Sequence, residues 1–483
     1  MRHSRVITAA VGAALAVWAA GPAHSGIPDG PGAPAETIDA CTYPDAAAAR
    51  KAWHPMRGSA EVEPAEVAGR RCLAMPCNFA GTSIERASWD RPGPVDLADR
   101  RGIRFKMFVR DPTPVGHFTM YLHSGDGWYA AGFAPQARGR WHTVAVEKRD
   151  TKIEGRPAGW GKVDIIRISA WRGKDEDTVL HLADLEAFGR PAAVLVVRAE
   201  SRIQAGADDG FTRYARQTAE MFEAVGLRAA VTSDLDLERE RLAGRRLLVL
   251  PYNPSLPEAA AKAVGGWMAD GGKIMAFYTM PAALREATGI VGGRNVSQQQ
   301  RGHFAEIRFS EDAPAGVPPR VGQASWNVHE AEAQGHGARV AARWFSADGT
   351  DTGLPAVIVS DRCVFMTHVL LEDDAERKRQ MLLALAGHLA PDLWQEAADG
   401  AIARVGRIGP YETFEAARGG IRETASASGR KEAVAALQEA GTRRDAARRL
   451  VGEGKFPEAV DAAAEARRLL VRARCLAQPA LEG

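Results

Sequence analysis

The sequence predicts a multidomain fold: an all-β sandwich, then an α/β domain, then an α-helical region. Three observations predict it. Gly and Pro separate short apolar runs up to about residue 190. Continuous apolar runs then alternate with helical patterns up to about residue 390, and Ala, Arg and Glu dominate the remainder. A chain of 483 residues has room for about three domains.

The composition excludes some classes of protein. Hydrophobic residues make up 46% and charged residues 25% of the chain, which is ordinary for a globular protein and unlike a disordered or fibrous one. Lys and Arg number 62 against 60 Asp and Glu, a net charge of +2. We therefore expect neither nucleic acid nor an anionic membrane as a partner.

The first 25 residues have the pattern of a signal peptide. Arg2 and Arg5 precede the apolar run Val6–Ala20, and small residues at Ala23 and Ser25 form a cleavage site. The run is shorter than the roughly 20 residues that span a bilayer. We expect an exported protein, periplasmic or extracellular, with no membrane attachment after cleavage and with a linker at 26–37.

Residues 38–190 are predicted to form the sandwich, because short runs there are separated by turn residues. Six of the chain's 11 tryptophans fall in this part, and Trp53 and Trp141 are assigned to its core. The predicted strands are Gly102–Val109, His117–His123, Trp128–Phe133, Trp141–Val146, Ile165–Trp171 and Thr178–Phe188.

One face of this sandwich is predicted to carry aromatic and polar side chains. Alternation points Phe118, Met120 and Leu122 inward, and a hairpin turn at 124–127 brings His123 opposite Trp128. Such a face suits sugars, because aromatic rings contact C–H faces while polar groups bond hydroxyls. The candidate carbohydrate-binding residues are Tyr121, His123, Trp128, Arg167, Trp171 and, in a loop, Trp160. The alternative is that a loop or the next domain covers the tryptophans.

The cysteines and carboxylates suggest few cofactors. Export permits a disulfide between Cys41 and either Cys72 or Cys77. The C-x4-C spacing has no second Cys or His pair, which argues against zinc, and Cys363 is predicted in a buried strand. Asp184 is a candidate ligand for a structural calcium; no other cofactor is expected and the metal stays open.

Residues 191–390 are predicted to form an α/β domain with a largely parallel sheet. Its buried strands and helices alternate along the chain. The predicted elements are strands at Val194–Val197, Leu227–Val231, Leu247–Pro251 and Lys273–Phe277, with a helix around Phe211–Val225 and another at Pro257–Asp270.

Residues 391–483 are predicted to be helical. Ala433–Val451 and Phe456–Arg474 form two helices joined at Gly452–Lys455, an αα-hairpin. The segment KFPEAVDAAAEA is similar to a single tetratricopeptide-like unit, and one unit cannot form a repeat array. A scaffold that binds protein through this hairpin is a further alternative.

Two segments resemble known families. The runs GWYAAGFAPQARGRWHTVAVEK and PAGWGKVDIIRISAWRG resemble the jelly-roll carbohydrate-binding-type modules at the front of large exported bacterial proteins. The run LVLPYNPSLPEAAAKAVGGWMADGGKIMAFYT resembles the class I glutamine amidotransferase-like fold, which implies a flavodoxin-like sheet.

The second resemblance does not extend to that family's nucleophile. Active members carry a Cys on a glycine-flanked elbow after a strand, followed later by a His and a Glu. The matching segment here, Tyr278–Ala282, has neither Cys nor Gly, and Pro281 restricts the turn. His368 stands roughly where the family's His would be. We expect an inactive domain; the alternative is a hydrolase or amidase acting around Tyr278, Thr279 and His368.

The order of these parts resembles the front half of exported bacterial glycosyl-hydrolase-like family 10 proteins, in which a (β/α)8-type catalytic domain follows. The sequence up to Gly483 leaves no room for such a barrel and offers no acid/base carboxylate pair. No catalytic residue is therefore nominated. The expected function is a non-catalytic glycan-binding or accessory protein. Its expected partners are a polysaccharide or oligosaccharide and a catalytic domain or protein encoded downstream.

Overall fold

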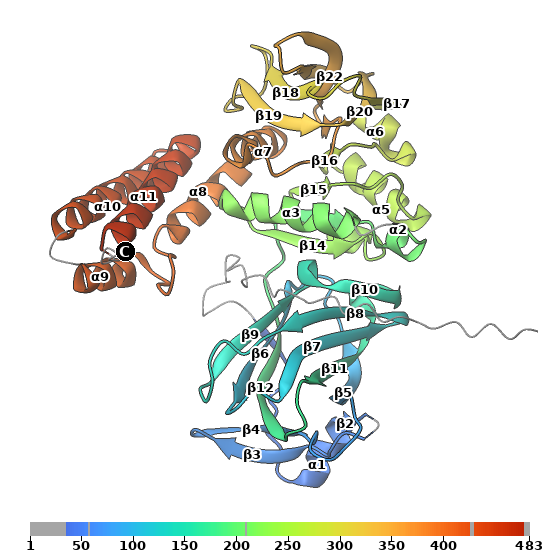
Figure 1. Cartoon of the computed structure of the whole chain (residues 1–483). Coiled ribbons are helices and arrows are strands. Elements are labelled where there is room, and N and C mark those ends of the chain that lie inside the picture. Colours follow the sequence, from blue (N-terminus) through green and yellow to red (C-terminus); the bar gives the residue numbers. More distant parts are fainter. Residues whose placement is uncertain (1–34, 57, 208–209, 426–428, 478–483) are drawn as a thin grey trace, which may run out of the picture.

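The computed structural model describes residues 35–56, 58–207, 210–425 and 429–477 as three successive parts (Figure 1). The expected signal peptide and most of the expected linker lie outside the described residues. Across these described ranges, no helix combines the length and apolar character needed to cross a membrane. The expected end of the linker is wrong, because Ala35–Asp39 pairs with Leu185–Phe188 and belongs to the sandwich.

The first part is a sandwich of two six-stranded antiparallel sheets. One sheet contains β1 (Ala35–Asp39), β3 (Glu63–Val67), β4 (Arg70–Cys77), β6 (Gly102–Val109), β9 (His142–Glu147) and β12 (Thr178–Phe188). The other contains β2 (His54–Pro55), β5 (Arg86–Val95), β7 (Val115–Ser124), β8 (Asp126–Phe133), β10 (Lys152–Arg156) and β11 (Val163–Arg172). Its connections contain α1 (Ala46–Ala52), η1 (Lys148–Asp150) and η2 (Trp160–Lys162).

The core between the two sheets follows the alternation in the sequence. Phe118, Met120 and Leu122 of β7 are buried in it, together with inward residues of the neighbouring strands. Trp53 is fully buried as expected, whereas Trp141 is only half-buried and donates from Nε1 to the Val67 carbonyl.

The expected disulfide is absent from the described residues, where Cys41, Cys72 and Cys77 are all free thiols. Cys72 and Cys77 lie an odd number of residues apart on β4, so they point to opposite faces of the strand. Cys77 and Cys41 belong to the core cluster, and Cys72 does not. The expectation of a bridge was wrong because spacing along the chain does not give the direction of a side chain.

The second part is an α/β domain built on a nine-stranded sheet. Five strands are parallel: β13 (Val194–Arg198), β14 (Ala229–Ser233), β15 (Leu247–Leu250), β16 (Ile274–Phe277) and β23 (Cys363–Met366). Numbered along the chain, their order is 2-1-3-4-5, the doubly wound order of flavodoxin-like sheets.

Helices cover both faces of this sheet. Residues of α3 and α7 pack on one face, and residues of α5 pack on the other. The helices are α2 (Glu200–Gln204), α3 (Gly210–Ala224), α4 (Arg239–Leu242), α5 (Glu258–Ala269), η3 (Ala282–Leu284), α6 (Arg285–Thr288) and α7 (Ala375–Leu389).

The sequence did not predict an antiparallel half of this sheet. It extends the parallel strands with β18 (Phe304–Phe309), β19 (Arg320–Ser325), β21 (Arg339–Phe345) and β22 (Asp351–Val359), and a separate ribbon is formed by β17 (Ile290–Ser297) and β20 (Asn327–Ala333). Many residues of these strands are exposed or half-exposed; the buried run Ala356–Val359 of β22 is an exception and resembles the parallel strands.

The third part is helical and lies beside the α/β domain (Figure 1). It contains α8 (Leu393–Arg404), α9 (Phe414–Thr424), α10 (Arg430–Gly452) and α11 (Phe456–Ala477). The last two form the expected αα-hairpin, turning at 453–455 and packing through alanine and leucine side chains.

Candidate functional site

The outer side of the sheet formed by β10, β8, β7, β11, β5 and β2 carries a row of aromatic and charged side chains. We call this surface the aromatic face and define it by Tyr121, His123, Trp128, Arg167 and Trp171, all of which are half-buried. The strand register places His123 opposite Trp128, as the sequence predicted, and it also places Tyr121 opposite Arg167. The structure thus brings five of the six candidate residues onto one surface.

Arg167 holds one end of the aromatic face in place. Its Nε and Nη2 donate to the two carboxylate oxygens of Asp90, at 2.6 and 2.9 Å. Its guanidinium carbon lies 4.4 Å from the centre of the Trp128 ring, and His123 meets that ring edge-on at 4.6 Å. The two-point ion pair fixes the orientation of the Arg167 guanidinium, and the guanidinium in turn fixes the orientation of the Trp128 ring.

Trp171 forms the other end of the aromatic face. The His117 ring stacks on it at 5.1 Å, and the Arg86 guanidinium lies 4.9 Å from its centre. Arg86 also lies 5.7 Å from the Tyr121 ring, so it links the two ends. The sequence did not predict that His117 and Arg86 belong to this surface. His117 has the same strand parity as Tyr121, which is the signal that would have found it.

The aromatic face carries little net charge near neutral pH. Desolvation lowers the pKa of His117 and raises the pKa of Tyr121, so both rings are neutral there. The charge of Arg167 is balanced by Asp90. Arg86 adds one positive charge, and Asp164, 2.6 Å from His123 Nδ1, adds one negative charge. Trp171 Nε1 is buried without a hydrogen-bond partner among the described residues. The surface therefore offers ring faces and hydrogen-bonding groups and favours an uncharged ligand.

Trp160 does not belong to this surface, and its assignment to the sugar-binding residues was wrong. It is 1% exposed, stacks on Tyr129 at 3.7 Å and donates from Nε1 to Glu200 of the α/β domain at 3.1 Å. The Trp160 backbone N–H also donates to Asp236 at 2.7 Å. Trp160 thus joins the sandwich to the α/β domain.

Gly159, the residue before Trp160, allows the Asp236 side chain to come close to the backbone of the sandwich. Gly159 has φ of +112°, and a Cβ there would lie 2.5 Å from an Asp236 oxygen. Burial raises the pKa of Asp236 to about 6. The fully buried Glu200 is paired with the fully buried Arg198, so the interface holds charged groups satisfied by partners in both parts.

The α/β domain does not assemble a nucleophile and a base from Thr279 and His368. Thr279 Oγ1 and His368 Nε2 each lack a hydrogen-bond partner within the described ranges, so they are not bonded to each other. Tyr278 occupies the left-handed conformation after β16, with φ of 66°. The side chain at the elbow position is therefore a phenol, whose pKa is raised by desolvation.

The proposed calcium ligand has another partner. Asp184 of β12 pairs with Arg70 at 2.5 Å. In the part of the chain that the structure describes, no three His, Cys, Asp or Glu side chains gather in a way that could hold a metal ion.

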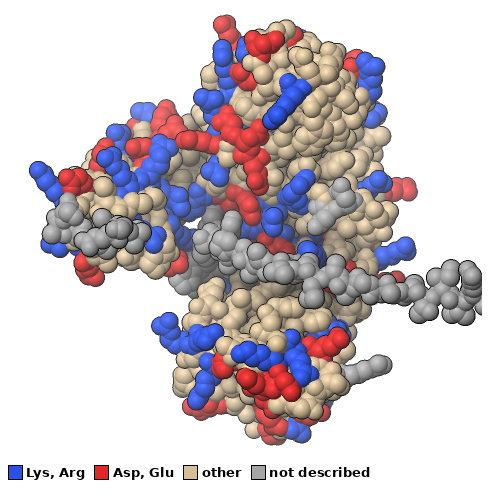
Figure 2. Space-filling view, in the orientation of Figure 1, with Lys and Arg blue, Asp and Glu red and all other residues tan. Residues whose placement is uncertain are grey.

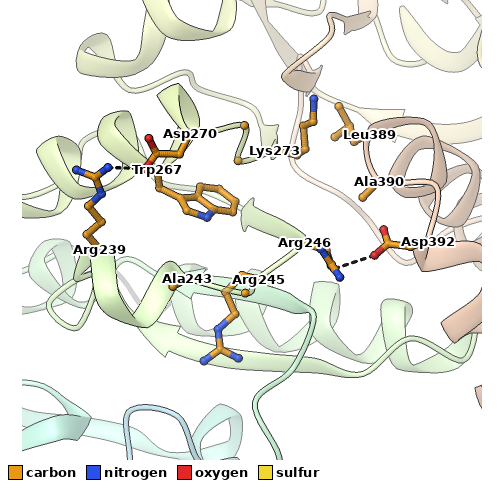
Figure 3. A pocket seen from close by; sticks show the side chains of 13 residues that line it. Arg239, Ala243, Arg245, Arg246, Trp267, Asp270, Lys273, Leu389, Ala390 and Asp392 are labelled. Carbon is orange, nitrogen blue, oxygen red and sulfur yellow. Dashed lines mark hydrogen bonds and ion pairs between the residues drawn. The ribbon is translucent and has the colours of Figure 1, made fainter.

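A cavity of about 500 Å³ lies at the opposite, amino-terminal edge of the parallel strands (Figure 3). Its charged side chains are paired, Arg239 with Asp270 at 2.5 Å and Arg246 with Asp392 at 2.7 Å. Ligands of such sheets bind at the carboxyl edge, so we assign this cavity no function. Figure 2 shows acidic and basic side chains interspersed over the visible face.

Comparison with known proteins gives partial structural similarities. No protein-family model matches the chain, and no curated protein matches it. A β-galactosidase from Rahnella sp. R3 aligns with 42% of this chain at 19% identity and TM-score 0.34, and the aligned part is 32% of that enzyme. An α-L-fucosidase from Paenibacillus thiaminolyticus aligns with 41% at 15% identity and TM-score 0.31, over 33% of its length.

A family 11 carbohydrate-binding module from Clostridium thermocellum, solved with a mixed-linked tetrasaccharide, aligns with 32% of this chain at 10% identity and TM-score 0.25, over 96% of the module. The chain thus spans about a third of the length of the two glycosidases. These similarities are low in identity and in score.

Proposed function

We propose that this protein is an exported, non-catalytic glycan-binding or accessory protein whose aromatic face binds a neutral polysaccharide or oligosaccharide. The observation that carries the proposal is the position of Trp128 under the Arg167 guanidinium, at 4.4 Å, on the outer side of a sheet. Trp128 is half-buried, so part of the indole is exposed to a ligand, whereas the Arg167 side chain is 13% exposed and positions that ring.

The dimensions of the aromatic face favour a chain of sugars. Trp128 lies level with His123, and Trp171 lies level with His117. These two histidines are six residues apart on β7, or about 20 Å along an antiparallel strand. Two aromatic platforms at that separation suit a ligand with several rings.

We further propose that the sandwich is a jelly-roll module of carbohydrate-binding type and that the α/β domain is an inactive amidotransferase-like domain. The 2-1-3-4-5 strand order and the tyrosine at the elbow position support the second assignment. A catalytic domain or protein encoded downstream would act on the glycan that this chain holds. The alternatives of a hydrolase at Thr279 and of a protein scaffold have no comparable observation in their favour.

Affinity gel electrophoresis tests the proposal. The full chain is run through gels containing soluble β-glucan, galactan, galactomannan or xylan. We expect retardation by at least one polysaccharide and an affinity about ten- to thirty-fold weaker in the Trp128→Ala/Trp171→Ala variant, the loss expected from two aromatic contacts of about 1 kcal/mol each.

Val471→Ala is the control, because Val471 is an exposed apolar side chain of α11, 40% accessible to solvent, and belongs to neither the aromatic face nor the α/β domain. It should migrate like the wild type. Unretarded migration in every gel, or retardation that the double substitution leaves unchanged while the variant melts normally, would contradict the proposal.

A further inference from the structure

A second group of side chains lies at the carboxyl edge of the parallel sheet. Strands β15, β16 and β23 are parallel neighbours, and continuing their register places Asn253, Thr279 and His368 at the same level. Ring contacts agree with this placement: the Tyr278 ring lies 5.4 Å from Tyr252 and 5.6 Å from His368. We call Asn253, Thr279 and His368, together with Asn327, the edge cluster.

The edge cluster contains five buried polar atoms without a hydrogen-bond partner in the described chain: Nδ2 and Oδ1 of Asn253, Oγ1 of Thr279, Oδ1 of Asn327 and Nε2 of His368. Asn253 and His368 are fully buried. Leaving such a group unpaired costs about 1–3 kcal/mol, and most buried polar groups are paired. Five of them at one edge indicate that something other than the protein pairs with them.

The position of the edge cluster is the one at which α/β sheets bind ligands. Ligands occupy the carboxyl ends of parallel strands, near the point where the strand order reverses. Here the order reverses between β13 and β15, and Asn253 follows β15 directly. Tyr278, after the adjacent β16, has a strained backbone with φ of 66°, a feature that concentrates at functional sites.

An exposed aromatic side chain lies beside the edge cluster. Trp326 is 48% accessible to solvent, and its ring meets the His368 ring edge-on at 4.8 Å. The next residue, Asn327, donates from Nδ2 to the Tyr278 hydroxyl at 3.1 Å. The Trp326 ring therefore lies next to the ring that carries the unpaired Nε2 of His368.

The edge cluster is uncharged. His368 Nδ1 lies 2.9 Å from the Val369 carbonyl, which accepts, and 3.1 Å from Nε2 of Gln323, which donates. The neutral ring therefore presents at Nε2 a lone pair in one tautomer and an N–H in the other. Desolvation lowers the pKa of His368 to about 4, so the ring is neutral at pH 7. The unpaired atoms therefore include amide, hydroxyl and imidazole groups, some of which donate and some of which accept hydrogen bonds. Such a set matches the hydroxyl groups of a ligand, since each hydroxyl can both donate and accept.

We propose that the carboxyl edge of the α/β sheet binds one small, uncharged, hydroxyl-rich molecule of the size of a single sugar ring, held by the edge cluster and covered by Trp326. This site lies in a different domain from the aromatic face and does not depend on it. Ordered water is the competing occupant, since it also satisfies buried polar atoms.

Saturation-transfer NMR with D-glucose, D-galactose and D-mannose, together with the thermal midpoint of the full chain, tests the proposal. We expect saturable binding of at least one sugar at about millimolar affinity. Asn253→Leu should weaken it about ten-fold or more and leave the midpoint unchanged or higher, because it removes two unpaired atoms and no hydrogen bond. Trp326→Ala, on the surface, should weaken it several-fold without affecting folding.

Two control variants separate the sites. Asn295→Ala changes an exposed asparagine of β17 and should bind like the wild type. The loss caused by Asn253→Leu should persist in the Trp128→Ala/Trp171→Ala background, in which the aromatic face is removed. The proposal is overturned if none of the sugars binds saturably at tens of millimolar, or if Asn253→Leu and Trp326→Ala bind as well as the wild type. A fall in the midpoint of Asn253→Leu with binding retained would assign the polar atoms to structural water and overturn it as well.

Discussion

Replacing Trp160 by alanine should loosen the sandwich from the α/β domain while leaving the aromatic face able to bind glycan. The indole is 1% exposed, stacks on Tyr129 at 3.7 Å and donates to Glu200. Truncating a buried aromatic side chain costs about 3–5 kcal/mol. For a part of this size, that corresponds to a fall in the thermal midpoint of roughly 6–20 °C.

Scanning calorimetry and affinity electrophoresis on the same preparations separate stability from binding. Trp160→Phe is the matched variant, because it keeps a ring against Tyr129 and loses only the bond to Glu200; it should cost about 1–2 kcal/mol. Trp128→Ala should show the opposite pattern, with less than about 1 kcal/mol of stability lost and weaker retardation. If Trp160→Ala weakened retardation with a midpoint near that of the wild type, the assignment of Trp160 to the interface would be refuted.

Three further predictions concern charge and redox state. Burial raises the pKa of Asp236 from 3.8 to about 6, and a raised folded-state pKa means that stability is lost as the pH rises from about 4 to about 6. Over this interval, the free energy of unfolding of the wild type, measured with urea, should fall by on the order of 2 kcal/mol relative to that of Asp236→Asn. Parallel curves of unfolding free energy against pH for the two proteins would contradict the prediction. Arg167→Lys should weaken the affinity for glycan several-fold and lower the free energy of unfolding by about 1 kcal/mol, because lysine cannot form the two-point bond to Asp90 or stack on Trp128. An unchanged affinity would remove Arg167 from the site. Reduction with dithiothreitol should leave the thermal midpoint unchanged because the described cysteines are free thiols, and a fall of several degrees would reveal a bridge.

Where periodicity was strong, the sequence located the elements closely. The strands predicted at Gly102–Val109 and Thr178–Phe188 have these bounds in β6 and β12. Alternation along a strand is a local property, and it also gave the side of β7 on which Tyr121 and His123 lie. The antiparallel strands between residues 304 and 359 were missed because polar residues interrupt β18, β19 and β21, whereas the buried apolar run Ala356–Val359 of β22 was overlooked.

The edge cluster shows the same limit in a functional site. The sequence singled out Thr279 and His368 as a possible nucleophile and base, and it did not mark Asn253 or Asn327. These four residues come from four parts of the chain separated by whole strands or helices. Their meeting at one edge follows from the strand order of the sheet, and no local pattern encodes that order.

By itself, the sequence determined the succession of the three parts and the face of each strand on which a side chain lies, because both depend on composition and on a period of two residues. Only the tertiary structure decided which of those faces stay open. Trp128 and Trp160 are chemically identical and 32 residues apart. The first is half-buried beside Arg167, and the second is enclosed where Glu200 of the α/β domain meets the sandwich. The difference arises because burial depends on what docks from elsewhere in the chain, which the residues next to a side chain do not determine.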